Sequence, residues 1–200
     1  MNDPELTAPA RSRIRSQDAR AVRSREALRG ALLLLVEEKP FEQIAIKELT
    51  ERAGVSYPVF FRQFSSKEEL LEDVAAGEVR NLLSRTNTAL TSPNIEQNLF
   101  EMCDYVNGRR TLWTTLLTGG ATSVMRAEFA RISDEIRRSR ERSNPWMPAE
   151  LATAFVVSGL FEILSWWLRQ PQDYPIANVV KLIDVLIIRS TMQPLDIELE

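Results

Sequence analysis

The sequence predicts an all-α protein, and three observations support this fold class. Apolar residues recur at spacings of three and four along most of the 200-residue chain, as on one face of a helix. No segment alternates apolar and polar residues over the length that a half-buried strand needs. Glycine and proline stand between the periodic segments, where they end helices. We therefore expect short N-terminal helices followed by a larger helical domain.

The composition excludes several classes of protein. With 44% apolar and 26% charged residues, the chain is neither disordered throughout nor a small disulfide-bonded scaffold. One cysteine allows no intramolecular disulfide, and the lack of histidine removes the usual zinc ligand and the Ser-His-Asp and Cys-His arrangements. We find no paired carboxylate motif, phosphate-binding glycine loop or metal-ligand spacing. The sequence thus predicts no enzyme, no catalytic residue, no cofactor and no metal.

The N-terminus and the longest apolar stretch bear on location. The chain begins polar and rich in arginine, without the apolar segment of a secretion signal. Residues 155–168 form an apolar stretch of 14 residues that Glu162 interrupts, which is too short to cross a bilayer. We expect a soluble, cytoplasmic protein with no membrane partner.

Charge is divided unevenly along the chain. Residues 11–67 contain 12 Lys and Arg against seven Asp and Glu, a formal balance of +5. Residues 68–200 contain 13 against 19, a balance of −6, so the net charge of −3 conceals the division. Such a split is typical of a segment that faces a polyanion and is joined to a different module.

Residues 1–18 are expected to form a flexible arm, because they contain two prolines and no apolar period. This arm has two interpretations. It is a solvated tail, or it is a basic arm that follows a phosphate backbone or enters a minor groove. The second interpretation depends on three arginines, which are Arg11, Arg13 and Arg15.

Residues 19–67 are expected to fold as three short helices. The first becomes regular at Ala21 and ends before Pro40, and the second spans 46–53. Gly54 suits the left-handed position that reverses the chain after a helix. Two short helices joined by a glycine turn form the helix-turn-helix pattern, whose second helix enters the major groove of DNA.

Capping residues define the helices that follow the glycine turn. The side-chain oxygen of Ser56 is expected to cap the second helix of the pair, with Pro58 in its first turn. Ser66 and Glu69 form a capping box that starts another helix at Lys67. Every later segment is predicted to be helical, over residues 67–90, 95–106, 109–117, 122–142, 149–169 and 175–192.

The last two predicted helices are apolar on more than one side, so both of their flanks must be covered. They are either interior helices of a larger core or the two helices that each protomer brings to a four-helix dimer interface.

One stretch of the chain carries a family motif: Phe41-x-x-Ile44-x-Ile46-x-x-Leu49-x-x-x-Ala53-Gly54-Val55-Ser56, then Phe60-Phe61-Arg62-x-Phe64-x-x-Lys67-Glu68-Glu69-Leu70. This motif resembles the DNA-binding domain of the TetR family of bacterial transcriptional regulators. The resemblance implies a homodimer that binds a palindromic double-stranded DNA operator through its helix-turn-helix domain. It also implies a C-terminal helical domain that dimerises and binds a small effector, which releases the DNA. Most such proteins are repressors.

The resemblance assigns residues 1–18 to the arm, 19–67 to the DNA-binding domain and 68–200 to the effector-binding and dimerisation domain. It implies these DNA-binding residues: Lys47, Ser56, Tyr57, Pro58, Val59, Phe61, Arg62 and Lys67. Three hydroxyls common in the family are missing, at Ala45, Val59 and Phe61. We expect Tyr57 to influence base preference. Lys67 is expected to contact a phosphate at a helix N-terminus, so its loss would weaken binding to every sequence and lower the salt dependence.

The resemblance also suggests an effector pocket for a small apolar or aromatic molecule. Its candidate residues, each of which also fits an ordinary core, are Cys103, Tyr105, Arg109, Trp113, Leu117, Met125, Phe129, Phe155, Phe161 and Glu162. Among them Glu162 is costly inside an apolar helix unless it is paired or lies at a cavity wall. The candidate dimer residues are Gly159, Ile163, Trp166, Trp167, Val180, Ile183 and Ile187. An architectural helix-turn-helix protein without a ligand is the alternative, and it requires a filled core instead of a cavity.

Overall fold

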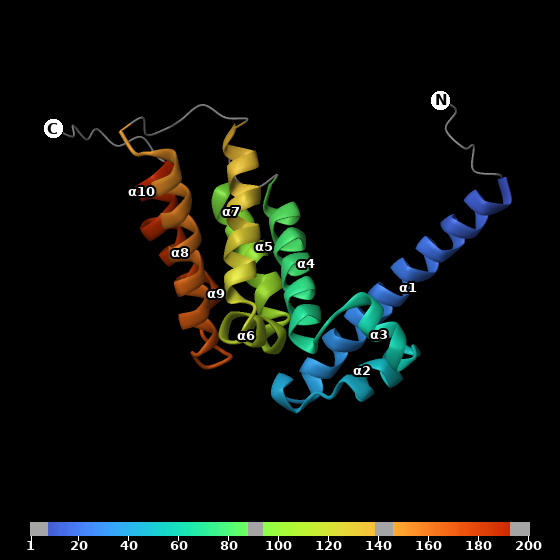
Figure 1. Ribbon diagram of the computed structural model, residues 1–200. Helices are drawn as coiled ribbons and strands as arrows, with labels where there is room; N and C mark the ends of the chain where they lie inside the picture. Colours follow the sequence, from blue (N-terminus) through green and yellow to red (C-terminus); the bar gives the residue numbers. More distant parts are fainter. Residues whose placement is uncertain (1–7, 88–93, 139–145, 193–200) are drawn as a thin grey trace, which may run out of the picture. The chain divides into compact units, whose positions relative to one another are not determined.

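A computed structural model describes residues 8–87, 94–138 and 146–192, and it divides the chain into two compact units between Leu71 and Glu72 (Figure 1). The described residues form helices and no strand, which confirms the expected all-α fold. The division falls close to the predicted domain boundary after residue 67.

The N-terminal unit is built on one long helix and several short ones. They are α1 (Ala8–Glu38), the 3-10 turn η1 (Phe41–Gln43), α2 (Ile46–Ala53), α3 (Tyr57–Gln63) and the start of α4 (Lys67–Asn87). Helix α1 packs against both α2 and α3, and α2 packs against α3. The predicted apolar stripe of α1 is buried, and the core that it forms with the short helices includes Leu28, Leu32, Leu49, Phe60, Phe64 and Leu70.

Helix α1 begins at Ala8 instead of near Ala21, so residues 8–18 are helical where the sequence predicted a flexible arm. Apolar periodicity detects only the part of a helix that faces a core, whereas alanine, arginine and glutamine favour a helix without one. Residues 1–7 of the predicted arm lie outside the described residues.

The glycine turn between α2 and α3 forms as predicted. Gly54 has a φ of 63°, and the Val55 N–H donates to the Thr50 carbonyl at 3.0 Å, which completes a Schellman-type helix end. Ser56 precedes α3, but its side chain makes no capping hydrogen bond. The reason is local: Pro58 has no N–H, and the Val59 N–H donates to the Ser56 backbone carbonyl at 2.9 Å.

The capping box before α4 forms in a modified way. The Glu69 N–H donates to Ser66 Oγ at 3.1 Å, as predicted. The Glu69 carboxylate, however, accepts from the backbone and hydroxyl of Ser65, each at 2.6 Å, instead of reaching the N–H of Ser66.

The C-terminal unit contains the rest of α4 and the following elements: α5 (Ile95–Asn107), α6 (Arg110–Thr118), α7 (Thr122–Arg138), α8 (Ala149–Leu168), α9 (Ile176–Ile183), the π-turn η2 (Asp184–Ile188) and α10 (Arg189–Met192). Helix α8 packs against α6, α7, α9 and η2, while α5 packs against α6 and α9 (Figure 1). The predicted ends of two helices, near residues 90 and 142, lie outside the described residues.

The predicted helix over 175–192 is interrupted by the π-turn. Within the core, Ile187 of the π-turn packs against Gly159 of α8. A Cβ added to Gly159 would lie 3.3 Å from two atoms of the Ile187 side chain. The missing side chain therefore allows this close approach within one protomer. Gly159, a candidate for the dimer interface, is half-buried and packs on one side against Ile187 of the same chain.

Helix α8 closely matches the predicted helix over 149–169 and contains a longer apolar window than the 14-residue stretch found in the sequence. It has 20 residues and a window of mean hydropathy 1.6, which by length and composition alone would suffice to cross a membrane. One face of it is a core face, where Val157, Leu160, Phe161, Leu164 and Trp167 are buried. Core helices of soluble proteins commonly have these properties, and this face assigns α8 to the core.

Candidate nucleic-acid interface

Helix α3 presents an exposed face supported by a buried one. Tyr57 and Phe61 are 52% and 47% exposed, and their ring centroids lie 5.1 Å apart. On the opposite side, Phe60 and Phe64 are buried in the core of the unit. Exposed aromatic side chains on so short and firmly anchored a helix are unusual for a surface that contacts only water.

Two contacts fix α3 against α1. The Gln63 side-chain amide donates to the Ala21 carbonyl at 3.1 Å, and the Arg25 guanidinium lies 5.0 Å from the Phe64 ring centroid. They hold the C-terminal turn of α3 and leave its N-terminal turn open to a partner.

The predicted DNA-binding residues fall into two groups. Six of the eight are exposed, and they are Lys47, Ser56, Tyr57, Pro58, Phe61 and Arg62. Val59 is half-buried. Lys47 has only a 3.8 Å ion pair with Glu51 on its own helix, so its ammonium is available to an anion.

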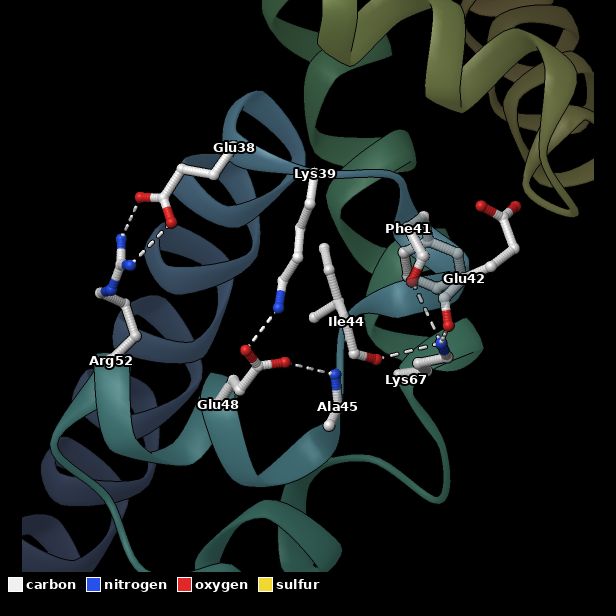
Figure 2. Close-up of polar contacts among 9 residues, drawn as sticks. All are labelled: Glu38, Lys39, Phe41, Glu42, Ile44, Ala45, Glu48, Arg52 and Lys67. Carbon is white, nitrogen blue, oxygen red and sulfur yellow. Dashed lines mark hydrogen bonds and ion pairs between the residues drawn. The ribbon is translucent and has the colours of Figure 1, made fainter.

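Lys67 is the exception, because its ammonium is engaged within the protein. Its Nζ donates to the backbone carbonyls of Phe41, Glu42 and Ile44 at 3.1, 3.0 and 3.0 Å (Figure 2). It also lies 4.7 Å from the Phe41 ring centroid. We call Lys67 and these three carbonyls the Lys67 cluster.

Carboxylates fix both ends of α2. Glu48 accepts from the Ala45 N–H at 2.9 Å and also from the Lys39 ammonium, and both bonds lower the pKa of its carboxyl group (Figure 2). Arg52 makes a bidentate pair with Glu38 of α1 at 2.7 and 2.9 Å, which lowers the pKa of Glu38. Glu48 thus supplies its own half of a capping box, while the other half, which needs a hydroxyl at residue 45, is absent because that residue is alanine.

The same segment matches a known family. Residues 28–74, which include α2, α3 and the first residues of α4, match the model for bacterial regulatory proteins of the tetR family. This segment of the chain is therefore similar to the DNA-binding domain of TetR-family regulators.

Two curated relatives are similar to this chain over a limited span. An uncharacterized HTH-type transcriptional regulator, YxbF of Bacillus subtilis, is 32% identical over 78 residues, which are 38% of this chain and 20% of YxbF. The HTH-type transcriptional activator FasR of Mycolicibacterium smegmatis is 39% identical over 70 residues, 33% of this chain and 32% of FasR. The chain therefore spans at most about a third of these relatives. They are transcriptional regulators and not enzymes, in agreement with the sequence analysis.

Solved structures share the fold over most of the chain. A TetR regulator from Streptococcus agalactiae gives a TM-score of 0.61 at 19% identity, covering 87% of this chain and 99% of its own. One from Rhodococcus sp. RHA1 gives 0.59 at 21%, covering 86% and 98%. RolR in complex with resorcinol gives 0.64 at 16%, covering 88% and 91%.

The structure separates the effector-pocket candidates by burial. Six are buried among α5 to α8, and they are Cys103, Trp113, Leu117, Met125, Phe129 and Phe161. Burial raises the pKa of the Cys103 thiol to about 12, so this thiol stays protonated at neutral pH. Phe155 is 48% exposed and lies outside the core. Glu162, expected to be paired or to lie at a cavity wall, is a surface residue paired with Arg126 at 3.1 Å.

A buried polar cluster was missed by the sequence analysis. Glu78 of α4 is 4% exposed, and its carboxylate accepts from the Tyr105 hydroxyl at 2.7 Å and from Arg109 at 3.2 Å. The ring of Trp113 stands edge-on to that of Tyr105, with 6.4 Å between centroids. Two predicted effector residues, Tyr105 and Arg109, thus share a carboxylate that nothing in the local sequence distinguishes from a surface glutamate.

The dimer candidates are largely part of the protomer's own core. Trp167, Val180, Ile183 and Ile187 are at most 3% exposed, which contradicts their assignment to an interface. Ile163 and Trp166 are half-buried. The apolar side chains that do face outward from α8 and η2 are Leu151, Phe155, Val185 and Leu186. The interface residues predicted from sequence therefore lie on different sides of these helices from the exposed apolar residues.

Proposed function

We propose that this protein is a ligand-responsive transcriptional repressor that binds a palindromic operator as a homodimer. The observation that carries the proposal is the exposed Tyr57–Phe61 face of α3, held by a buried core in a family of DNA-binding regulators. Tyr57 supplies a hydroxyl to base edges, while Pro58 and Val59 offer apolar contacts to thymine methyl groups. Lys47 and Arg62 supply charge to the phosphate backbone, and the arginines early in the sequence add to the positive charge of the unit.

The second unit supplies dimerisation. Its exposed apolar face borders an open groove of about 400 Å³, lined by Tyr174, Asn178, Lys181, Leu182, Val185 and Leu186. An exposed apolar face that spans two neighbouring helices suits an isologous interface, in which the same patch of each protomer meets its copy. A two-fold dimer presents two copies of α3, which matches an inverted repeat in the DNA. A DNA-binding regulator works beside the chromosome, so we place it in the cytoplasm.

The effector is proposed to bind near Trp113. This side chain is 1% exposed and stands edge-on to Tyr105, and its indole N–H, like those of Trp146 and Trp167, has no hydrogen-bond partner among the described residues. A buried donor without an acceptor is rare, and an oxygen of a bound molecule satisfies it. The aromatic surroundings favour a small aromatic effector, and RolR, which shares the fold, was solved with resorcinol.

A second candidate is an architectural DNA-binding protein without a ligand. The packing of the central helices favours it, because six of the proposed pocket residues are buried as in an ordinary core. Repression itself is distinguished from activation by a reporter assay, and one curated relative, FasR, is named an activator.

Selection of DNA from a random duplex pool by the full-length protein tests DNA binding. We expect an enriched inverted repeat, and a pool that stays random after several rounds would overturn the proposal. A panel of small phenols, resorcinol included, then tests ligand response on the selected duplex. At least one compound is expected to release the DNA from the wild type and to act more weakly on Trp113→Phe. Failure of every compound would leave the architectural function.

A further inference from the structure

Lys67 occupies the first position of α4, where the family resemblance implies a phosphate contact. A lysine ammonium has three N–H donors and no acceptor. All three have acceptors within the protein, at 3.0 to 3.1 Å, in the Lys67 cluster (Figure 2). A phosphate could be bound only by giving up one or more of these bonds.

The three carbonyls lie in η1, a turn of three residues, and directly after it. The Phe41 carbonyl also accepts from the Ile44 N–H at 3.0 Å, whereas Lys67 is the partner that the structure shows for the carbonyls of Glu42 and Ile44. Ile44 is extended and buried. The ammonium therefore replaces the water that the Glu42 and Ile44 carbonyls would otherwise need.

The segment from Phe41 to Ala45 is held from a second side by Glu48. This carboxylate binds the Ala45 N–H and the Lys39 ammonium, so contacts from α2 and from α4 converge on the same few residues. The segment ends where α2 begins. Its position sets the start of the first helix of the helix-turn-helix pair, and through the glycine turn it sets α3.

We infer that Lys67 is a positioning residue, which holds the segment before α2 in place and does not bind DNA phosphate. The effect of Lys67 on DNA affinity rests on the proposed DNA-binding function, whereas its effect on the stability of the fold does not. The cation also lies at the positive end of the α4 dipole, which is unfavourable for it, and three carbonyl dipoles compensate. Lys47, the exposed lysine of this unit, remains available to bind the phosphate backbone.

The test compares Lys67→Met with the matched control Lys47→Met in the full-length protein. Thermal unfolding and the affinity for a duplex of fixed sequence are measured at several salt concentrations. Lys67→Met is expected to lower Tm by about 5 °C or more, through loss of charged hydrogen bonds. It weakens DNA binding by the same factor at each salt concentration, so the slope of log K against log [salt] is unchanged. Lys47→Met keeps the wild-type Tm and reduces that slope by about 0.9.

An unchanged Tm together with a reduced slope for Lys67→Met would overturn the inference. If the wild type fails to bind DNA at all, the proposed function fails while the Tm comparison still tests Lys67. If Lys67→Met does not fold, the wild type itself provides the measurement, through acetylation of its lysine amines with and without DNA. DNA is expected to protect Lys47 and to leave the slower rate at Lys67 unchanged. Protection of both lysines would contradict the inference.

Discussion

The two units of this protein hold their helices together by different means. In the N-terminal unit, α2 and α3 are only eight and seven residues long, and charged side chains bind the backbone segments beside them. In the C-terminal unit α5, α7 and α8 are 13, 17 and 20 residues long, and charged side chains mostly bind each other across or along helices, as Glu128 binds Arg80 and Arg131. Short helices have many unpaired end groups for each residue, so they depend more on side-chain partners.

The comparison also separates two kinds of exposed apolar surface. On α3 the exposed rings of Tyr57 and Phe61 stand among polar and cationic neighbours, as expected of a surface that meets DNA. On α8 and η2 the exposed apolar side chains are aliphatic or phenyl, as expected of a surface that meets protein. Four predictions test these two differences between the units.

The largest effect is expected from charges introduced on the exposed apolar face of the C-terminal unit. Phe155→Glu combined with Leu186→Glu should convert the dimer to a monomer, because two carboxylates would be buried against their own copies. Light scattering at micromolar concentration measures the mass. Phe100→Glu, at a 42% exposed position of α5, is the control and should keep the dimer mass. A double variant that stays dimeric, or a monomeric wild type, would refute the proposed interface.

The next effect concerns the buried Glu78 cluster. Tyr105→Phe removes one hydrogen bond from a buried carboxylate, which we expect to cost about 1.5–3 kcal/mol of unfolding free energy. Tyr174→Phe is the control and should cost less than about 0.5 kcal/mol, because the ring of Tyr174, which stands edge-on to that of Trp166, is kept. Urea unfolding followed by tryptophan fluorescence suits this measurement, because all four tryptophans lie in the C-terminal unit. Equal losses for the two variants would remove any special role of the cluster.

A smaller effect is expected from acid. Hydrogen bonds from Arg131 and Arg80 lower the pKa of Glu128 to about 2, so the unfolded chain binds the proton more readily than the folded protein. The stabilisation is complete above the ordinary glutamate pKa and is lost as the pH falls from about 4.5 towards 2. Glu128→Gln should reduce the loss of stability over this range by roughly 1–2 kcal/mol. Parallel pH profiles for variant and wild type would contradict this assignment.

Much of the N-terminal fold was predictable from its sequence, because glycine and capping residues act locally. The bounds of α2, the left-handed Gly54 and the Ser66 cap all follow from residues within a few positions of each other. The role of Lys67 was not predictable in this way. Its partners are backbone carbonyls 23 to 26 residues earlier, and a carbonyl has no residue type by which to identify it.

The C-terminal unit was less predictable for a different reason. A helix that is apolar on nearly every side does not reveal its orientation, so Trp167 and Ile183 were assigned to an interface although they are core residues. Two glutamates show the same limit. Glu78 has the sequence surroundings of a surface residue and is buried, whereas Glu162 stands among apolar residues in the sequence and is exposed.

The central claim is that the exposed face of α3 reads bases, and one measurement tests it most directly. Anisotropy titrations compare the affinity for the selected operator with that for a scrambled duplex, in the wild type, Tyr57→Ala and Lys47→Met. Tyr57 is 52% exposed, so its replacement leaves the core intact. We predict that Tyr57→Ala lowers the ratio of the two affinities by about tenfold, as loss of one base contact does. Lys47→Met weakens both affinities alike. An unchanged ratio for Tyr57→Ala would contradict the account.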